Sequence, residues 1–143
     1  MSIENSLTRR TVIGGAGMGA AGLTLTACGS GKNSKDESLT DSKAPASPTD
    51  VAAASDVPVG GALKATAGNL TVMLTQPAEG TFKAFSSVCT HQGCQLNVQN
   101  KDLMCPCHAS SFSIEDGSVQ GGPAPEPLPE YKAEVKDGRV IVS

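Results

Sequence analysis

The sequence predicts a small all-β domain, built as an antiparallel barrel or sandwich. From residue 57 to residue 143 the chain runs through short segments that alternate apolar and polar side chains, which is the pattern of half-buried strands. Gly, Asp and Pro residues separate these segments, and the pairs Asp116-Gly117 and Asp137-Gly138 are hairpin signals. No stretch of this region keeps the 3.6-residue period of an amphipathic helix. A fold made of short antiparallel strands is therefore expected.

The strands are predicted in the order in which their patterns occur. They are residues 70–74, 81–85, 101–104, 112–114, 118–119, 131–135 and 139–142. The two Asp-Gly pairs lie between neighbouring segments of this series, so each is predicted to close a hairpin. Residues 121–129 contain four prolines, which lack the N–H that a sheet ladder needs, so this stretch is predicted to be a stiff loop.

The first 56 residues are expected to lie outside the folded domain. In residues 1–27, Arg9 and Arg10 precede an uncharged Gly/Ala-rich run and resemble a twin-arginine export signal. The alternative, a membrane-spanning helix, needs about 20 mostly apolar residues, whereas this run has 16. Cys28 ends a short sequence that resembles a bacterial lipobox, in which the cysteine is lipidated. Residues 28–56 are polar and small and are predicted to be a disordered tether, which leaves 57–143 for the domain.

The composition limits the class of protein. The net charge is −3 with both signs mixed, and no basic patch occurs, so nucleic acid is not an expected partner. The chain has three Phe, one Tyr and no Trp. A short domain with so few aromatic side chains is expected to need covalent or metal links in addition to its core.

Two short boxes carry the residues that such links require. Both histidines and four of the five cysteines lie in residues 89–94 and 105–112. Thiolate and imidazole groups bind zinc, copper and iron–sulfur centres. A zinc site would leave two cysteines over, and a disulfide scaffold would leave both histidines unused. A redox dithiol of the thioredoxin type needs two residues between its cysteines, whereas Cys105 and Cys107 have one between them.

The two boxes together resemble those of the Rieske iron–sulfur proteins, which read C-T-H-x-G-C and C-P-C-H-x-S. The resemblance covers roughly residues 57–143 and is to the disulfide-containing, exported type, such as the iron–sulfur subunit of cytochrome bc complexes. It implies one [2Fe–2S] cluster per chain, held in a subdomain of two loops plus a proline loop. The ligands that it implies are Cys89 and Cys105 on one iron and His91 and His108 on the other. It also implies a disulfide between Cys94 and Cys107.

The resemblance assigns roles to three neighbouring residues. Ser110 matches the position whose hydroxyl bonds a bridging sulfide. Phe112 stands where high-potential members have a Tyr that bonds a ligating sulfur, so a potential below the top of the family range is expected. Ala109 stands where the family usually has Gly, and a positive φ there would carry an energetic cost.

With the export signal, these features imply an extracytoplasmic electron-transfer protein, lipid-anchored on the outer face of the bacterial cell membrane. Its expected partner is a redox protein or a membrane complex, such as a cytochrome or a quinol-oxidising subunit. We expect it to be an electron-transfer component of an oxidoreductase rather than a catalyst on its own. A stand-alone carrier or a small subunit of another extracytoplasmic oxidoreductase is the alternative, because Gln92 stands where respiratory members present Leu. A ferredoxin of an oxygenase system is less expected, since such ferredoxins lack the extra cysteine pair.

Overall fold

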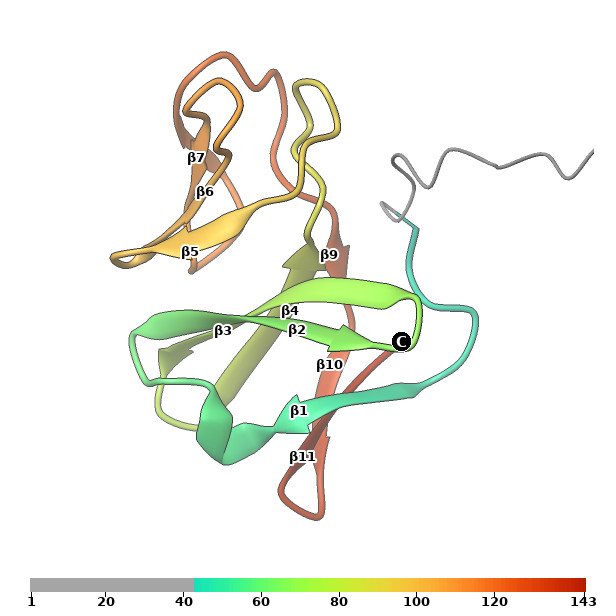
Figure 1. Cartoon of the computed structure of the whole chain (residues 1–143). Helices are drawn as coiled ribbons and strands as arrows, with labels where there is room; N and C mark the ends of the chain where they lie inside the picture. The colour runs from blue at the N-terminus through green and yellow to red at the C-terminus, as the bar shows by residue number, and fades with distance from the viewer. Residues whose placement is uncertain (1–42) are drawn as a thin grey trace, which may run out of the picture. The chain divides into compact units, whose positions relative to one another are not determined.

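Residues 43–143, which the computed structural model describes, form eleven short strands and one 3₁₀ turn (Figure 1). The strands are β1 (Thr49–Ala53), β2 (Gly61–Ala67), β3 (Leu70–Ala78), β4 (Thr81–Ser86), β5 (Asn97–Gln99), β6 (Asp102–Met104), β7 (Ser111–Phe112), β8 (Val119–Gly121), β9 (Glu130–Tyr131), β10 (Ala133–Lys136) and β11 (Arg139–Val142), and the turn η1 is Ala54–Asp56. The predicted all-β class is confirmed. Over residues 43–143 there is no helix with the length and apolarity that crossing a membrane requires.

The strands form three antiparallel sheets. Their strand orders are β1-β11-β10, β2-β3-β4-β9 and β5-β6-β7-β8. The Asp137-Gly138 hairpin is confirmed, because Lys136 pairs with Arg139 and both turn residues have positive φ, as a type I′ turn requires. The Asp116-Gly117 pair lies in a longer connection, in which Gly117 donates its amide to the Ser113 carbonyl.

The folded part begins earlier than the sequence predicted. Residues 49–53 belong to the predicted tether, yet they form β1 and pair with β11. Val51 and Ala52 are buried there, and Asp50 accepts a bidentate ion pair from Arg139. Local composition missed this strand because its partner lies about 90 residues further along the chain. Arg9, Arg10 and Cys28 lie outside the described residues.

The sheet β2-β3-β4-β9 has both faces buried. Side chains of a strand point alternately to its two faces, and in β3 Val72 and Leu74 pack into one core cluster with β1 and β11. Met73 points the other way and pairs across the strands with Phe85, and both side chains are fully buried in a second cluster. This second cluster joins the central sheet to β6 and β7. The third sheet therefore rests on a packed base, which positions the loops that it carries.

Candidate metal centre

Three loops extend from the same end of the third sheet (Figure 1). The first loop is residues 87–96, the second loop is residues 105–110, and the proline loop is residues 122–129. The first and second loops contain the two Cys/His boxes, so the fold brings together the residues that the sequence singled out.

The first and second loops share one backbone hydrogen-bond pattern. In each, the first cysteine donates its amide to the carbonyl five residues on and accepts a bond from the amide four residues on. The four bonds are Cys89 N to Cys94 O (2.8 Å), Gly93 N to Cys89 O (2.9 Å), Cys105 N to Ser110 O (2.8 Å) and Ala109 N to Cys105 O (3.1 Å). This tight closure satisfies the loops' own polar groups and fixes the direction of each first cysteine.

Cys89 and Cys105 are the free thiols of the described residues, and both are only 2% exposed. They belong to the same core cluster as Phe112. Burial raises the pKa of the Cys89 thiol and the adjacent Cys105 adds to the rise, while the backbone amides of His91 and Gln92 lower it. Those amides are aimed at the Cys89 sulfur, where they would stabilise a thiolate or a metal-bound sulfur.

The two imidazoles lie outside the thiols. His91 Nδ1 and His108 Nδ1 are 3.2 Å apart, and the rings meet edge to face with their centroids 4.7 Å apart. His91 is half-buried and His108 is exposed. The site therefore has a buried sulfur side and an accessible nitrogen side.

The predicted disulfide is confirmed. Cys94 of the first loop is bonded to Cys107 of the second. It links the loops covalently without using either free thiol. The Sγ atoms of Cys94, Cys105 and Cys107 lie within 4.8 Å of one another.

The proline loop is attached to both other loops. Thr90 Oγ1 donates to the Glu126 carbonyl (2.7 Å), and the Ala124 amide donates to Ser110 Oγ (3.2 Å). Gly122, with φ +84°, lies so close to the second loop that a Cβ atom on it would be 2.5 Å from Ser110 Cα. Sequence reasoning found the prolines but missed the bracing roles of Thr90 and Gly122. A Gly just before a proline run was the one signal that could have pointed to a close approach.

Ser110 and Phe112 are both fully buried beside the site. Because the Ser110 hydroxyl accepts the Ala124 amide, its own hydrogen is directed to a second acceptor. Phe112 is in register with Leu103 of β6 and packs with both thiols. Their effect on a redox potential is taken up as a proposal below.

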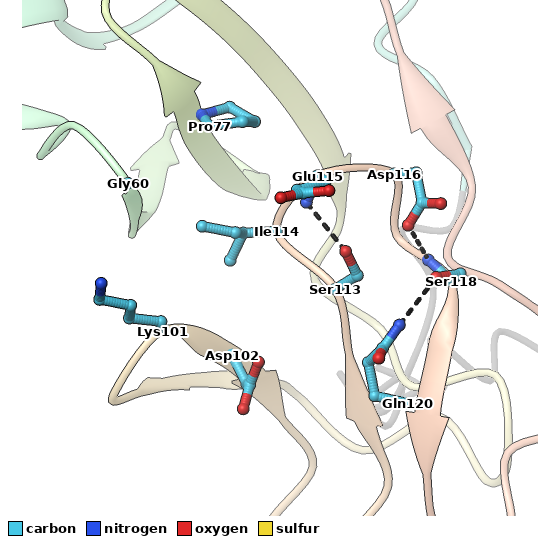
Figure 2. Close-up of a pocket in the computed structure, with 10 residues that line it drawn as sticks. All are labelled: Gly60, Pro77, Lys101, Asp102, Ser113, Ile114, Glu115, Asp116, Ser118 and Gln120. Atoms are coloured by element: carbon cyan, nitrogen blue, oxygen red, sulfur yellow. Dashed lines mark hydrogen bonds between the residues drawn. The ribbon is translucent and has the colours of Figure 1, made fainter.

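A separate polar hollow of about 500 Å³ lies beside the β5–β6 turn and the β7–β8 connection (Figure 2). It is lined by Gly60, Pro77, Lys101, Asp102, Ser113, Ile114, Glu115, Asp116, Ser118 and Gln120. None of the predicted site residues lines it. Its side chains bond mostly within their own turn, for example Ser118 N to Asp116 Oδ1 (3.0 Å).

The fold and the donor set define an iron–sulfur protein. The family model for the Rieske [2Fe-2S] domain matches residues 47–132, more than half of the chain. The chain belongs to this family, and its cofactor is one [2Fe–2S] cluster. Two buried thiols and two adjacent imidazole nitrogens fit such a cluster, in which histidines replace cysteines on one of the two irons.

Similarity to individual proteins points the same way. Over 66 residues the chain is 39% identical to the cytochrome b6-f complex iron-sulfur subunit of Chlorobaculum tepidum, covering 45% of this chain and 36% of that protein. It is 41% identical over 58 residues to the cytochrome bc1 complex Rieske iron-sulfur subunit of Streptomyces lividans, covering 38% and 34%. A putative respiratory nitrate reductase subunit Rieske of Haloferax mediterranei is 38% identical over 64 residues, covering 43% and 29%. The chain thus matches about a third of the length of these relatives.

Solved structures show the same fold. The crystal structure of the plasma membrane Rieske protein PetC3 from Synechocystis PCC 6803 is similar with a TM-score of 0.57 at 31% identity, covering 66% of this chain and 98% of that one. The ferredoxin of carbazole 1,9a-dioxygenase from Nocardioides aromaticivorans has a TM-score of 0.55 at 22% identity, covering 68% and 97%. The second similarity speaks for the fold alone.

Proposed function

We propose that this protein is an extracytoplasmic electron carrier that serves a membrane respiratory oxidoreductase of the quinol-to-cytochrome type, as its subunit or partner. The observation that carries the proposal is a pair of accessible imidazoles in contact, His91 and His108, on the same two loops as the two buried thiols. Relatives that share the matched segment are named as iron-sulfur subunits of cytochrome b6-f and bc1 complexes.

The proposed ligands are Cys89 and Cys105 for one iron and His91 and His108 for the other. The bound cluster supplies one-electron chemistry, with potentials in this class between about −150 and +300 mV. The chain's own residues shape that chemistry. The buried thiols and the core around them keep water from the sulfur side, and the imidazole edge is left for contact with a partner. The Nδ1 atoms of His91 and His108 lie 3.2 Å apart. With these atoms on the iron, the Nε2 atom of each ring would be left to carry a proton.

Spectroscopy and metal analysis test the ligand set. The purified full chain is expected to contain iron and acid-labile sulfide in equal amounts and to show the rhombic EPR signal of a cluster with mixed ligands. His91→Ala and His108→Ala are expected to abolish that signal, whereas Gln92→Ala, a change of the exposed residue that follows His91 in the sequence, is expected to keep it. A colourless protein that binds zinc would refute the proposal.

The partner is tested by purification from membranes. Solubilisation in mild detergent, followed by affinity purification of the full chain, is expected to bring down a cytochrome-containing complex. A second candidate is a small subunit of a different oxidoreductase, and two observations favour it. The Haloferax relative is named for a nitrate reductase, and the exposed residue Gln92 of the first loop stands where respiratory members present Leu. Recovery of a molybdenum subunit without a cytochrome would support that candidate instead.

Export and anchoring are further parts of the proposal. They rest on Arg9, Arg10 and Cys28, in the part of the sequence before residue 43. A disulfide such as Cys94–Cys107 persists in oxidising compartments, which agrees with export. Arg9→Lys combined with Arg10→Lys is expected to stop export of the cluster-containing protein, and Cys28→Ser to release it from the membrane. Normal membrane-bound, extracytoplasmic accumulation of both variants would contradict this part.

A further inference from the structure

Cys105 lies against the disulfide as well as beside Cys89. Its Sγ atom, Cys94 Sγ and Cys107 Sγ are all within 4.8 Å of one another. Cys89, the other free thiol, is not a member of this group among the described residues. One thiol that is proposed to bind iron is therefore also a close neighbour of both sulfurs of the bond that links the two loops.

Thiol–disulfide exchange proceeds by attack of a thiolate on one sulfur of a disulfide, and Cys105 Sγ lies within reach of both sulfurs of this one. We propose that, whenever the cluster is absent, Cys105 acts as an internal nucleophile toward the Cys94–Cys107 disulfide. Its sulfur bonds to Cys94 Sγ, the Cys94–Cys107 bond breaks, and Cys107 leaves as a thiolate. Cys105 gives up one proton to solvent and Cys107 takes one up. Electrons and atoms balance within the chain, so no external oxidant or reductant is needed.

Attack is directed to Cys94 rather than Cys107 for two reasons. Cys105 and Cys107 are separated by a single proline, so a bond between them would close a very small ring. Cys107 is also exposed, so the departing thiolate is released into water, whereas Cys94 is partly buried against the second core cluster. The product still links the two loops, now through Cys94 and Cys105.

This exchange removes one of the four proposed iron ligands. This loss of a ligand rests on the proposed function. The exchange itself depends only on the positions of the three sulfur atoms. Iron bound at Cys105 would block the attack. The cluster and the native disulfide are therefore linked: the chain keeps the Cys94–Cys107 bond while Cys105 is occupied and isomerises when it is not.

Thiol mapping of the full chain tests the exchange. The purified protein is divided, and one half is stripped of iron and sulfide by a chelator in acid, where thiols are protonated and exchange is stopped. Both halves are then brought anaerobically to pH 8 with an excess of iodoacetamide. Peptide fragment ions on either side of Pro106 distinguish label on Cys105 from label on Cys107. Cys105→Ser and Cys89→Ser variants are stripped and treated in the same way.

In the stripped wild-type chain, label is expected on Cys107, because the reagent traps this exposed thiol as soon as it is released. The Cys107 label is expected to be at least about tenfold higher than in Cys105→Ser, which has no internal nucleophile, and to persist in Cys89→Ser. Label confined to Cys89 and Cys105 in the stripped wild type would overturn the proposal, as would equal Cys107 label in Cys105→Ser. Label on Cys107 in the portion that keeps its cluster would show that iron does not protect the disulfide. That result would remove Cys105 from the proposed ligands, but it would not contradict the exchange.

Discussion

Gly93 and Ala109 occupy equivalent positions in the first and second loops. Each donates its amide to the carbonyl of the cysteine four residues earlier, and each has a positive φ, 75° at Gly93 and 57° at Ala109. A left-handed conformation costs a non-glycine residue about 1–2 kcal/mol, because its Cβ approaches the following carbonyl. The second loop therefore carries a strain that the first loop avoids.

Ala109→Gly is expected to relieve that strain. The free energy of unfolding should rise by about 1 kcal/mol, which for a domain of this size corresponds to a thermal midpoint about 4–8 °C higher. Thermal unfolding followed by circular dichroism measures the shift. Ala78→Gly, an exposed position in β3 without positive φ, is the matched control and should lose stability instead. A loss in Ala109→Gly comparable to that of the control would contradict the assignment of strain.

Gly122→Ala is expected to lift the proline loop from the second loop. Its Cβ would lie 2.5 Å from Ser110 Cα and 2.8 Å from the Ala109 carbonyl, so backbone has to move. The bond from the Ala124 amide to Ser110 should be lost with it. We expect a loss of more than about 2 kcal/mol in the free energy of unfolding and faster removal of iron by a chelator.

Gly80→Ala separates the clash from the conformational cost. Gly80 has a similar φ of +77°, but a Cβ there would meet nothing within 4 Å. Its loss should be about 1–2 kcal/mol, with the rate of iron removal unchanged. Equal stability losses in the two variants, with equal rates of iron removal, would show that the close approach of Gly122 has no consequence for the site.

Ser110→Ala is expected to lower the midpoint potential. The Ser110 hydroxyl is fully buried and holds the Ala124 amide as acceptor, which directs its hydrogen toward the site. A hydrogen bond to a charged group contributes about 1.5–3 kcal/mol, and a one-electron couple shifts by about 59 mV per 1.4 kcal/mol. If the bond favours the reduced, more negative state, voltammetry should show a fall of about 60–130 mV. Ser113→Ala, which removes a hydroxyl from a turn away from the ligands, should leave the potential unchanged.

The local sequence predicted the chemistry of the site better than its packing. The resemblance of the two boxes to those of the Rieske family predicted the Cys94–Cys107 bond, which the structure confirms. Asp137-Gly138 likewise predicted its hairpin, since the turn needs two positive φ angles that Asp and Gly tolerate. The hairpin turn depends only on residues that are adjacent in the sequence.

The missed features depend on partners far away in the chain. Local composition predicts a tether at β1, because its few apolar residues become a strand only when they pair with β11. The role of Gly122 depends on the backbone of Ser110 in a different loop. The run Leu70 to Leu74 was predicted as an alternating strand, whereas in β3 both faces are buried by different sheets. Such contacts leave no periodic signal in the sequence.

Acid is expected to weaken the β10–β11 hairpin through Glu134. Hydrogen bonds from Lys132 and Lys136 lower the pKa of this carboxyl below its usual range. The unfolded chain therefore binds the proton first as the pH falls. The stability that the ion pairs of Glu134 contribute is fully present above about pH 5 and is lost as the pH falls through the folded-state pKa. Urea midpoints at pH 7 and pH 3.5 should differ less in Glu134→Gln than in the wild type. Glu79→Gln, which removes a carboxyl without an ion pair among the described residues, should keep the wild-type difference.

Thr75→Val is expected to stabilise the base on which the site rests. Thr75 is fully buried in β3, and its Oγ1 is the buried side-chain atom without a hydrogen-bond partner among the described residues. Leaving a buried hydroxyl unsatisfied costs about 1–3 kcal/mol, whereas Val has nearly the same shape and no polar atom. A gain of about 1 kcal/mol in the free energy of unfolding should appear in urea denaturation. Thr71→Val is the matched control in the same strand, because its hydroxyl bonds Thr66 Oγ1 at 3.1 Å and should yield no gain. A loss in Thr75→Val would show that an internal water satisfies the hydroxyl, since buried waters bond polar groups that the protein leaves over.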